Sequence, residues 1–278
     1  LMDGSTLKAG EAEIGGAPEG LDALVVADAL KEEGGIALFV ARDLSRATQF
    51  AQAMAFFAPD VETLTFPAWD VLPYDRLSPT PAVSAERMAA LSRLGRRDPK
   101  DPTPLLVVTT VSAATQRVPA RSLTQDAAFE ASIGDEVDLA ELERHFAANG
   151  YVRASTVSER GEFAVRGGVV DVFPPGFEEP VRLDLFGSEL EQIRTFDPET
   201  QRSTGKRESL TLAPVSEALL TPESISRFRT GWLNLFGAAG DDMMYAAVSE
   251  GARRQGLEHW LPLLHERLDT LFDHLPDG

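Results

Sequence analysis

The first part of the chain alternates between helical and strand-like patterns of apolar positions. Asp43 precedes one helical pattern and Ser84 another, and both residue types favour the N-cap position. Strands that alternate with helices predict a mostly parallel sheet covered on both faces. The expected helices span 21–33, 43–58 and 84–97, and the expected strands span 35–40, which is a continuous apolar run, 61–66 and 104–110.

The pattern changes near residue 127, where short runs separated by glycine and proline replace the long alternation. A helix over 138–150 is followed by expected strands over 151–157, 162–166, 168–173, 181–186 and 188–196. Such spacing predicts an antiparallel sheet and therefore an α+β unit. From residue 214 onward the pattern is helical again, over 221–237 and 241–256. We therefore expect three segments, 1–126, 127–213 and 214–278, with the second inserted between two parts that pack together.

One predicted strand carries an unusual polar face. Val181, Leu183 and Leu185 alternate with Arg182, Asp184 and Phe186, and in an earlier strand Arg166 lies opposite Phe163 and Val165. In one interpretation Arg182 pairs with Asp184 or Glu162 on a solvated sheet and Phe186 tucks beneath the Gly187 turn. In the other, arginine and phenylalanine form a protein-binding surface, because such residues are enriched at interface hot spots. The pattern alone favours the solvated sheet.

Composition narrows the possible functions. The chain has 44 acidic and 26 basic residues and a net charge of −18, which disfavours the phosphate contacts that nucleic-acid affinity requires. The absence of cysteine excludes disulfides and is compatible with a reducing cytoplasm. No apolar run approaches the roughly 20 residues of a membrane span. We expect a cytoplasmic protein that does not contact a membrane.

Catalytic motifs are not recognisable in the sequence. The stretch "GEAEIGGA", residues 10–17, matches the glycines of a phosphate-binding loop, but Gly16 and Ala17 stand where that loop needs lysine and a hydroxyl residue. No G-x-S-x-G elbow is present, and the four histidines lack metal-ligand spacing. The sequence therefore predicts a protein without catalytic residues, cofactor or metal.

Three long stretches resemble the bacterial transcription–repair coupling factors, the Mfd family: residues 66–94, 158–203 and 256–264. The resemblance implies the amino-terminal module of that family, which is similar to the repair helicase subunit UvrB. It implies a degenerate helicase-like domain 1a of the P-loop-NTPase type over 1–126 and an inserted domain 2 over 127–213. Domain 1b, over 214–278, would pack back on the first domain and end early relative to the family.

The resemblance also implies a function. Domain 2 of the family recruits the UvrA protein by imitating UvrB during nucleotide excision repair, without ATPase, helicase or lesion-clamping activity of its own. Arg166, Arg182 and Phe186 match the family positions that meet UvrA, and Arg194 is added to them, although its strand places Leu190 and Phe196 on the same face. DNA and RNA polymerase would be bound by other domains of a full-length chain. Two alternatives stay open: an ATP-binding UvrB-like helicase fragment and a DNA-binding module.

Overall fold

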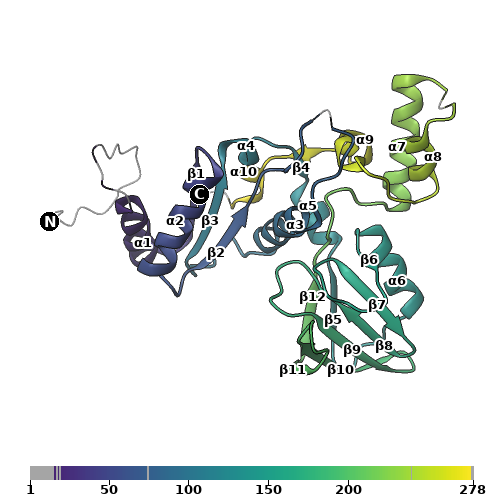
Figure 1. Ribbon diagram of the computed structural model, residues 1–278, viewed down its shortest axis with the longest axis horizontal. Helices are drawn as coiled ribbons and strands as arrows, with labels where there is room; N and C mark the ends of the chain where they lie inside the picture. Colours follow the sequence, from purple (N-terminus) through teal and green to yellow (C-terminus); the bar gives the residue numbers. More distant parts are fainter. Residues whose placement is uncertain (1–15, 17, 19, 74, 239, 277–278) are drawn as a thin grey trace. The chain divides into compact units, whose positions relative to one another are not determined.

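The computed structural model describes residues 16, 18, 20–73, 75–238 and 240–276 (Figure 1). By its internal contacts the chain divides into two compact units. The first holds the residues up to Ala68 together with Arg97–Gln116, and the second holds Trp69–Arg96 and Arg117–Pro276. Most of the glycine stretch at 10–17 lies outside the described residues. The predicted three-segment division stays a prediction.

The first unit contains a three-stranded parallel sheet in the order β1-β3-β2, which confirms the predicted parallel α/β pattern. Leu106 and Val108 of β3 pack with Phe50 and Met54 in one apolar core. The Asp43 carboxylate accepts a hydrogen bond from the Arg46 backbone N–H at 2.9 Å, so the predicted N-cap is confirmed. The elements are α1 (Leu21–Glu33), β1 (Ile36–Ala41), α2 (Leu44–Phe57), β2 (Glu62–Phe66), β3 (Leu105–Thr110) and α4 (Val111–Ala114).

The helix predicted from Ser84 begins one turn earlier. In the second unit α3 spans Pro81–Gly95, with Thr80 at the N-cap and Pro81 at the first helical position. The fixed backbone angle of proline suits that position, and its missing N–H has no partner to lose there. The predicted boundary was wrong because proline, which breaks the interior of a helix, is favoured at its first position.

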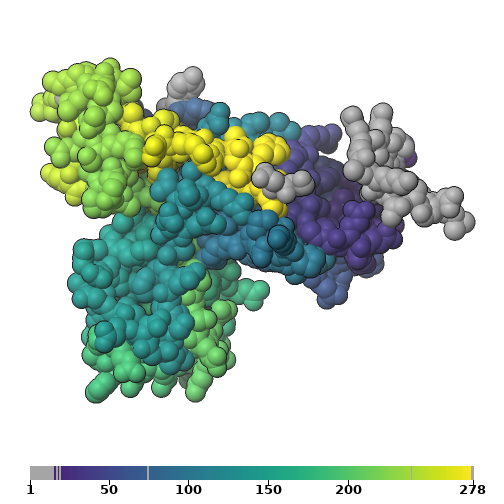
Figure 2. Space-filling view, turned by 180° about the vertical axis from the view of Figure 1, so that it is seen from behind, coloured from purple at the N-terminus to yellow at the C-terminus, as the bar shows by residue number. Residues whose placement is uncertain are grey.

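A six-stranded sheet forms the centre of the second unit, in the order β11-β10-β9-β8-β7-β6. All neighbouring strands are antiparallel except β6 and β7, which run parallel, so the predicted all-antiparallel sheet needs this correction. Figure 2 shows this region as a continuous body of teal and green atoms. The strands are β6 (Val152–Arg153), β7 (Glu162–Arg166), β8 (Val169–Val172), β9 (Val181–Phe186), β10 (Glu189–Phe196) and β11 (Ser203–Arg207).

One face of this sheet forms the largest core of the second unit. Helix α6 (Leu139–Ala148), capped by the Asp138 carboxylate, contributes Leu142 and Phe146 to it. A two-stranded ribbon of β5 (Phe129–Ser132) and β12 (Ser209–Leu212), which the sequence pattern missed, adds further apolar side chains. This side of the sheet is therefore covered by α6 and by the β5–β12 ribbon.

The rest of the second unit is mainly helical. The Thr221 side chain caps α7 (Pro222–Phe236), but α8 (Met243–Ser249) is shorter than the expected helix over 241–256 because Gly251 adopts a left-handed conformation, φ +73°. No helix among the described residues is long and apolar enough to cross a membrane. The remaining elements are β4 (Val118–Pro119), α5 (Arg121–Asp126), η1 (Leu257–Trp260), α9 (Leu261–Leu264), β13 (Leu268–Asp269) and α10 (Leu271–His274).

A buried ion pair joins distant segments of the second unit. Arg87 of α3 is fully buried and donates to the Glu217 carboxylate at 2.5 Å. The Trp69 indole N–H donates to the same carboxylate at 3.1 Å. Because an unpaired buried charge is costly, this arrangement favours a single placement of the chain segment that leaves the six-stranded sheet.

Candidate protein-binding face

The strand register separates the side chains of the six-stranded sheet into two faces. Val170, Leu183 and Ile193 are paired in register and belong to the core. Asp171, Arg182 and Arg194 are likewise directly opposite one another, on β8, β9 and β10, and point to the other side. The predicted alternation along β9 is therefore confirmed. We call this second side the outer face.

The charged side chains of the outer face form a ladder. Arg182 makes a two-point ion pair with Asp171, with Nε–Oδ1 at 2.6 Å and Nη2–Oδ2 at 2.9 Å, and Arg166 donates to the same carboxylate. Arg194 pairs with Asp184, with Nη2–Oδ2 at 2.6 Å. The charge ladder thus consists of Arg166, Asp171, Arg182, Asp184 and Arg194, and it carries one more positive than negative charge.

Asp171 is the central group of the charge ladder. Its side chain is 0% exposed, whereas those of Arg182 and Arg166 are 17% and 48% exposed. A buried carboxylate needs paired charges and hydrogen bonds, and the two arginines supply both. The hydrogen bond to Asp171 is the main cause that raises the pKa of Arg182 above its ordinary value. The Arg182 guanidinium is therefore held in a defined orientation.

Phe196 supports Arg182 from the same side of the sheet. The guanidinium lies 4.6 Å from the centre of the Phe196 ring, a cation–π geometry. Phe196 is itself buried in a small apolar cluster with Val157, Ala164 and Phe173. One end of the outer face is therefore filled by apolar packing, and the charge ladder extends from it toward the opposite end.

A β-bulge places Arg194 on the outer face. Simple alternation puts Leu190 and Arg194 on one face, but the register of β10 against β9 shifts between Leu190 and Gln192. Leu190 consequently faces the core, while Arg194 lies directly opposite Arg182. Two arginines in that position would repel each other, and their pairing with the Asp171 and Asp184 carboxylates offsets this repulsion.

Phe186 lies at the other end of the outer face. Its side chain is 74% exposed, so the interpretation in which it tucks beneath the Gly187 turn is wrong. Arg166 lies at this same end, because Arg166 pairs in register with Val169, which in turn pairs with Asp184, two residues before Phe186. The structure therefore brings the four predicted residues onto one face, and their role in binding stays a prediction.

Sequence reasoning missed Asp171 as a partner of the arginines. It expected Arg182 to pair with Asp184 or Glu162, whereas the Glu162 carboxylate accepts hydrogen bonds from the Ser158 and Glu159 backbone. A signal was present in the sequence, because Asp171 is a charged residue within the otherwise apolar strand Val169–Val172. A carboxylate in such a strand needs a cationic partner. The strand partner that would connect the two could not be read from either strand alone.

Comparison with known proteins defines the class to which this sheet belongs. A family model described as the UvrB interaction domain matches residues 129–217, which include β5, the six-stranded sheet and β12. The outer face thus lies within the part of the chain that matches this family model.

The whole chain has a more particular relationship. It is 31% identical over 266 residues to the transcription-repair-coupling factor of Haemophilus influenzae, covering 95% of this chain and 23% of that protein. It is 31% identical to the Escherichia coli factor (97% of this chain, 23% of that protein) and 35% identical to that of Myxococcus xanthus (86% and 20%). The chain belongs to the transcription-repair-coupling factor family and spans less than a quarter of the length of these relatives.

Proposed function

We propose that this chain is a recruitment module of a transcription-coupled nucleotide excision repair factor, and that its outer face binds the UvrA protein as UvrB would. The match of residues 129–217 to the UvrB interaction domain supports the class of partner. Resemblance to the family supports UvrA as that partner, and domains of a longer chain would bind DNA and RNA polymerase.

The fixed orientation of Arg182 is the main reason for choosing the outer face as the binding surface. Arg182 is held by a buried carboxylate and an aromatic ring, so little side-chain freedom is lost when a partner binds it. The excess positive charge of the charge ladder suits an acidic surface, and the exposed Phe186 ring offers apolar area beside it. A fixed arginine next to an exposed aromatic ring has the composition of an interface hot spot.

Calorimetric titration of this chain with purified UvrA tests the proposal. Arg182→Ala and Phe186→Ala should each weaken binding by about 2 kcal/mol or more. Arg182→Glu should weaken it further, because repulsion is added to the lost contact. Arg144→Ala is the matched control: Arg144 is an exposed arginine on α6, which packs against the core face of the sheet. Equal binding by all four variants would place the UvrA site elsewhere.

We further propose that the first unit is a degenerate helicase-like domain without ATPase activity. Gly16 and Ala17 replace the lysine and hydroxyl residue that phosphate binding and Mg²⁺ require. In addition, the Arg46 N–H at the start of α2, beside the carboxyl end of β1, already donates to the Asp43 carboxylate. Filter binding with labelled ATP tests this proposal, and tight binding at micromolar protein would overturn it.

A further inference from the structure

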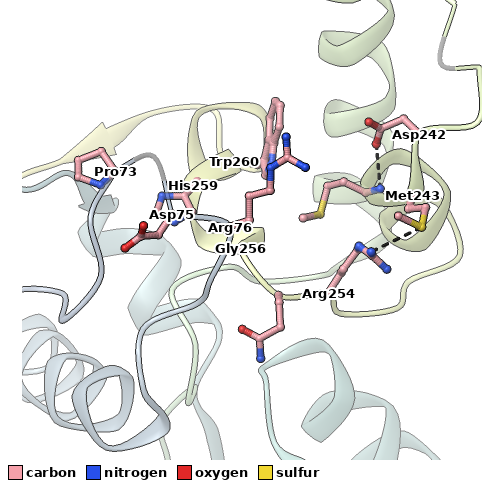
Figure 3. A pocket seen from close by; sticks show the side chains of 11 residues that line it. Pro73, Asp75, Arg76, Asp242, Met243, Arg254, Gly256, His259 and Trp260 are labelled. Atoms are coloured by element: carbon pink, nitrogen blue, oxygen red, sulfur yellow. Dashed lines mark hydrogen bonds between the residues drawn. The ribbon is translucent and has the colours of Figure 1, made fainter.

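A second binding site is suggested by a cavity remote in sequence from the charge ladder. The cavity has a volume of about 620 Å³ and is lined by residues of three segments: the connection before α3, the start of α8 and the turn before η1 (Figure 3). Two arginines, one aromatic ring and two methionines contribute to its walls: Arg76, Arg254, Trp260, Met243 and Met244.

The two arginines of this cavity have no carboxylate partner among the described residues. None of the described carboxylates lies within ion-pairing distance of Arg76 or Arg254, and the polar contact of Arg254 is with the Met243 sulfur at 3.6 Å. The acidic residues of the cavity have other partners. Asp75 accepts from the Leu72 backbone N–H, and Asp242 caps α8 through the Met244 and Tyr245 N–H groups. The cavity therefore holds two guanidinium groups without a carboxylate partner among the described residues, in a chain with a net charge of −18.

The arginine-bearing segments, about 180 residues apart in sequence, are held together by hydrogen bonds. The Ser78 backbone N–H donates to Gln255 Oε1 at 3.0 Å, and the Gly256 N–H donates to Ser78 Oγ at 3.0 Å. His259 Nε2 donates to the Leu77 carbonyl at 3.1 Å. Gly256 is also in a left-handed conformation, φ +82°, and a Cβ there would lie 3.0 Å from the Arg76 carbonyl oxygen. The positions of Arg76 and Arg254 are therefore preorganised.

Aromatic packing fixes the position of Trp260, which forms the apolar wall of the cavity. Trp260 packs against Trp232, with ring centres 4.7 Å apart, and against Phe236 at 5.9 Å. Met243 is 63% exposed, and Phe236 is also exposed. Methionine adapts to different partner shapes, and aromatic residues, methionine and arginine are the residues enriched at protein interfaces.

We propose that this cavity binds a protein segment that carries an acidic side chain next to an apolar one. The carboxylate would pair with Arg76 and Arg254, and the apolar side chain would contact Trp260 and Met243. The Asp75 and Asp242 carboxylates at the same cavity disfavour a polyphosphate or a nucleic-acid backbone, since these carry several closely spaced negative charges. A peptide with a single carboxylate and free backbone N–H groups matches both signs of charge. This site is independent of the proposed UvrA-binding face.

Selection of random short peptides displayed on phage, performed on the folded 278-residue chain, tests the proposal. Selected peptides should combine Asp or Glu with a neighbouring aromatic or leucine residue. In fluorescence anisotropy with synthetic versions, Arg76→Gln and Arg254→Gln should each weaken binding about tenfold, as expected when a charged hydrogen-bonded pair is lost. Replacing the acidic residue of the peptide by its amide should have the same effect.

Matched control variants show whether the peptide binds at this cavity. Arg229→Gln removes an exposed arginine of α7 outside the cavity, and Arg182→Ala alters the outer face; both should leave peptide affinity unchanged. Gly256→Ala should weaken binding in protein that still melts cooperatively. The proposal is overturned if the best peptides lack acidic residues or bind the Arg76→Gln/Arg254→Gln double variant equally well. It is also overturned if ATP or single-stranded DNA, and not peptide, binds in a manner that depends on these arginines.

Discussion

The two larger sheets among the described residues use their faces differently. In the first unit all six residues of β3 are buried, and the strand reads as the uninterrupted run LLVVTT. In the second unit β9 alternates between buried Val181 and Leu183 and partly exposed Arg182 and Asp184. A central strand of a parallel sheet is buried on both faces, whereas an antiparallel sheet can keep one face for other contacts. The difference indicates that the central strand of the first sheet serves packing alone, whereas β9 presents polar side chains on the face that we propose for binding.

Leu106→Asp should have the largest effect on stability. Leu106 is fully buried in the core of the first unit, and an unpaired carboxylate there should cost about 4 kcal/mol or more, enough to unfold this unit. Val40→Asp, on the neighbouring edge strand β1 at a partly exposed position, is the control and should cost about 1 kcal/mol. Urea unfolding followed by circular dichroism measures both. Similar losses for the two variants would contradict the contrast between buried and exposed positions in this sheet.

Leu183→Ala should have the next largest effect, because it removes a fully buried side chain from the core face of the six-stranded sheet. The free energy of unfolding should fall by about 3 kcal/mol. Leu185→Ala, two residues along the same face but only partly buried, should cost less. If chemical denaturation shows that Leu183→Ala lowers the free energy of unfolding by less than about 1 kcal/mol, this face does not form the main core.

Asp171→Asn should destabilise the chain by about 2 kcal/mol, because it leaves the Arg166 and Arg182 guanidinium groups without the buried carboxylate. It should also weaken UvrA binding, since Arg182 would lose its fixed orientation. Asp184→Asn, which affects the more exposed pair with Arg194, is the control and should cost less. Thermal melts and calorimetry on the same samples measure both effects. Unchanged stability and binding in Asp171→Asn would remove the proposed positioning role.

Phe186→Ala should have the smallest effect on stability, within about 0.5 kcal/mol, although it should weaken UvrA binding strongly. Its ring is exposed at the end of the outer face, so truncation removes little buried area. Differential scanning calorimetry provides the measurement. A marked fall in melting temperature, with binding retained by the folded fraction, would show that Phe186 contributes to folding and not to the interface.

Much of the local structure was determined by the sequence itself. The apolar periodicity predicted α1 and the three parallel strands to within a residue or two, because these patterns report burial directly. Alternation along β9 assigned Arg182 and Phe186 to the face opposite the core without knowledge of neighbouring strands. The helix over 241–256 was overextended because a glycine in its last turns can end a helix or be tolerated within it.

Only the tertiary structure decided how the site is assembled. The pairing of Arg182 with Asp171 depends on which strands are neighbours, and the face of Arg194 depends on a bulge that exists only when β10 is paired with β9. The cavity between Arg76 and Arg254 likewise depends on hydrogen bonds between segments far apart in sequence. Periodicity reports which side of an element is buried, because burial acts on each residue separately. The identity of the partner across a sheet or a cavity is set by long-range contacts, which form only when the whole chain folds.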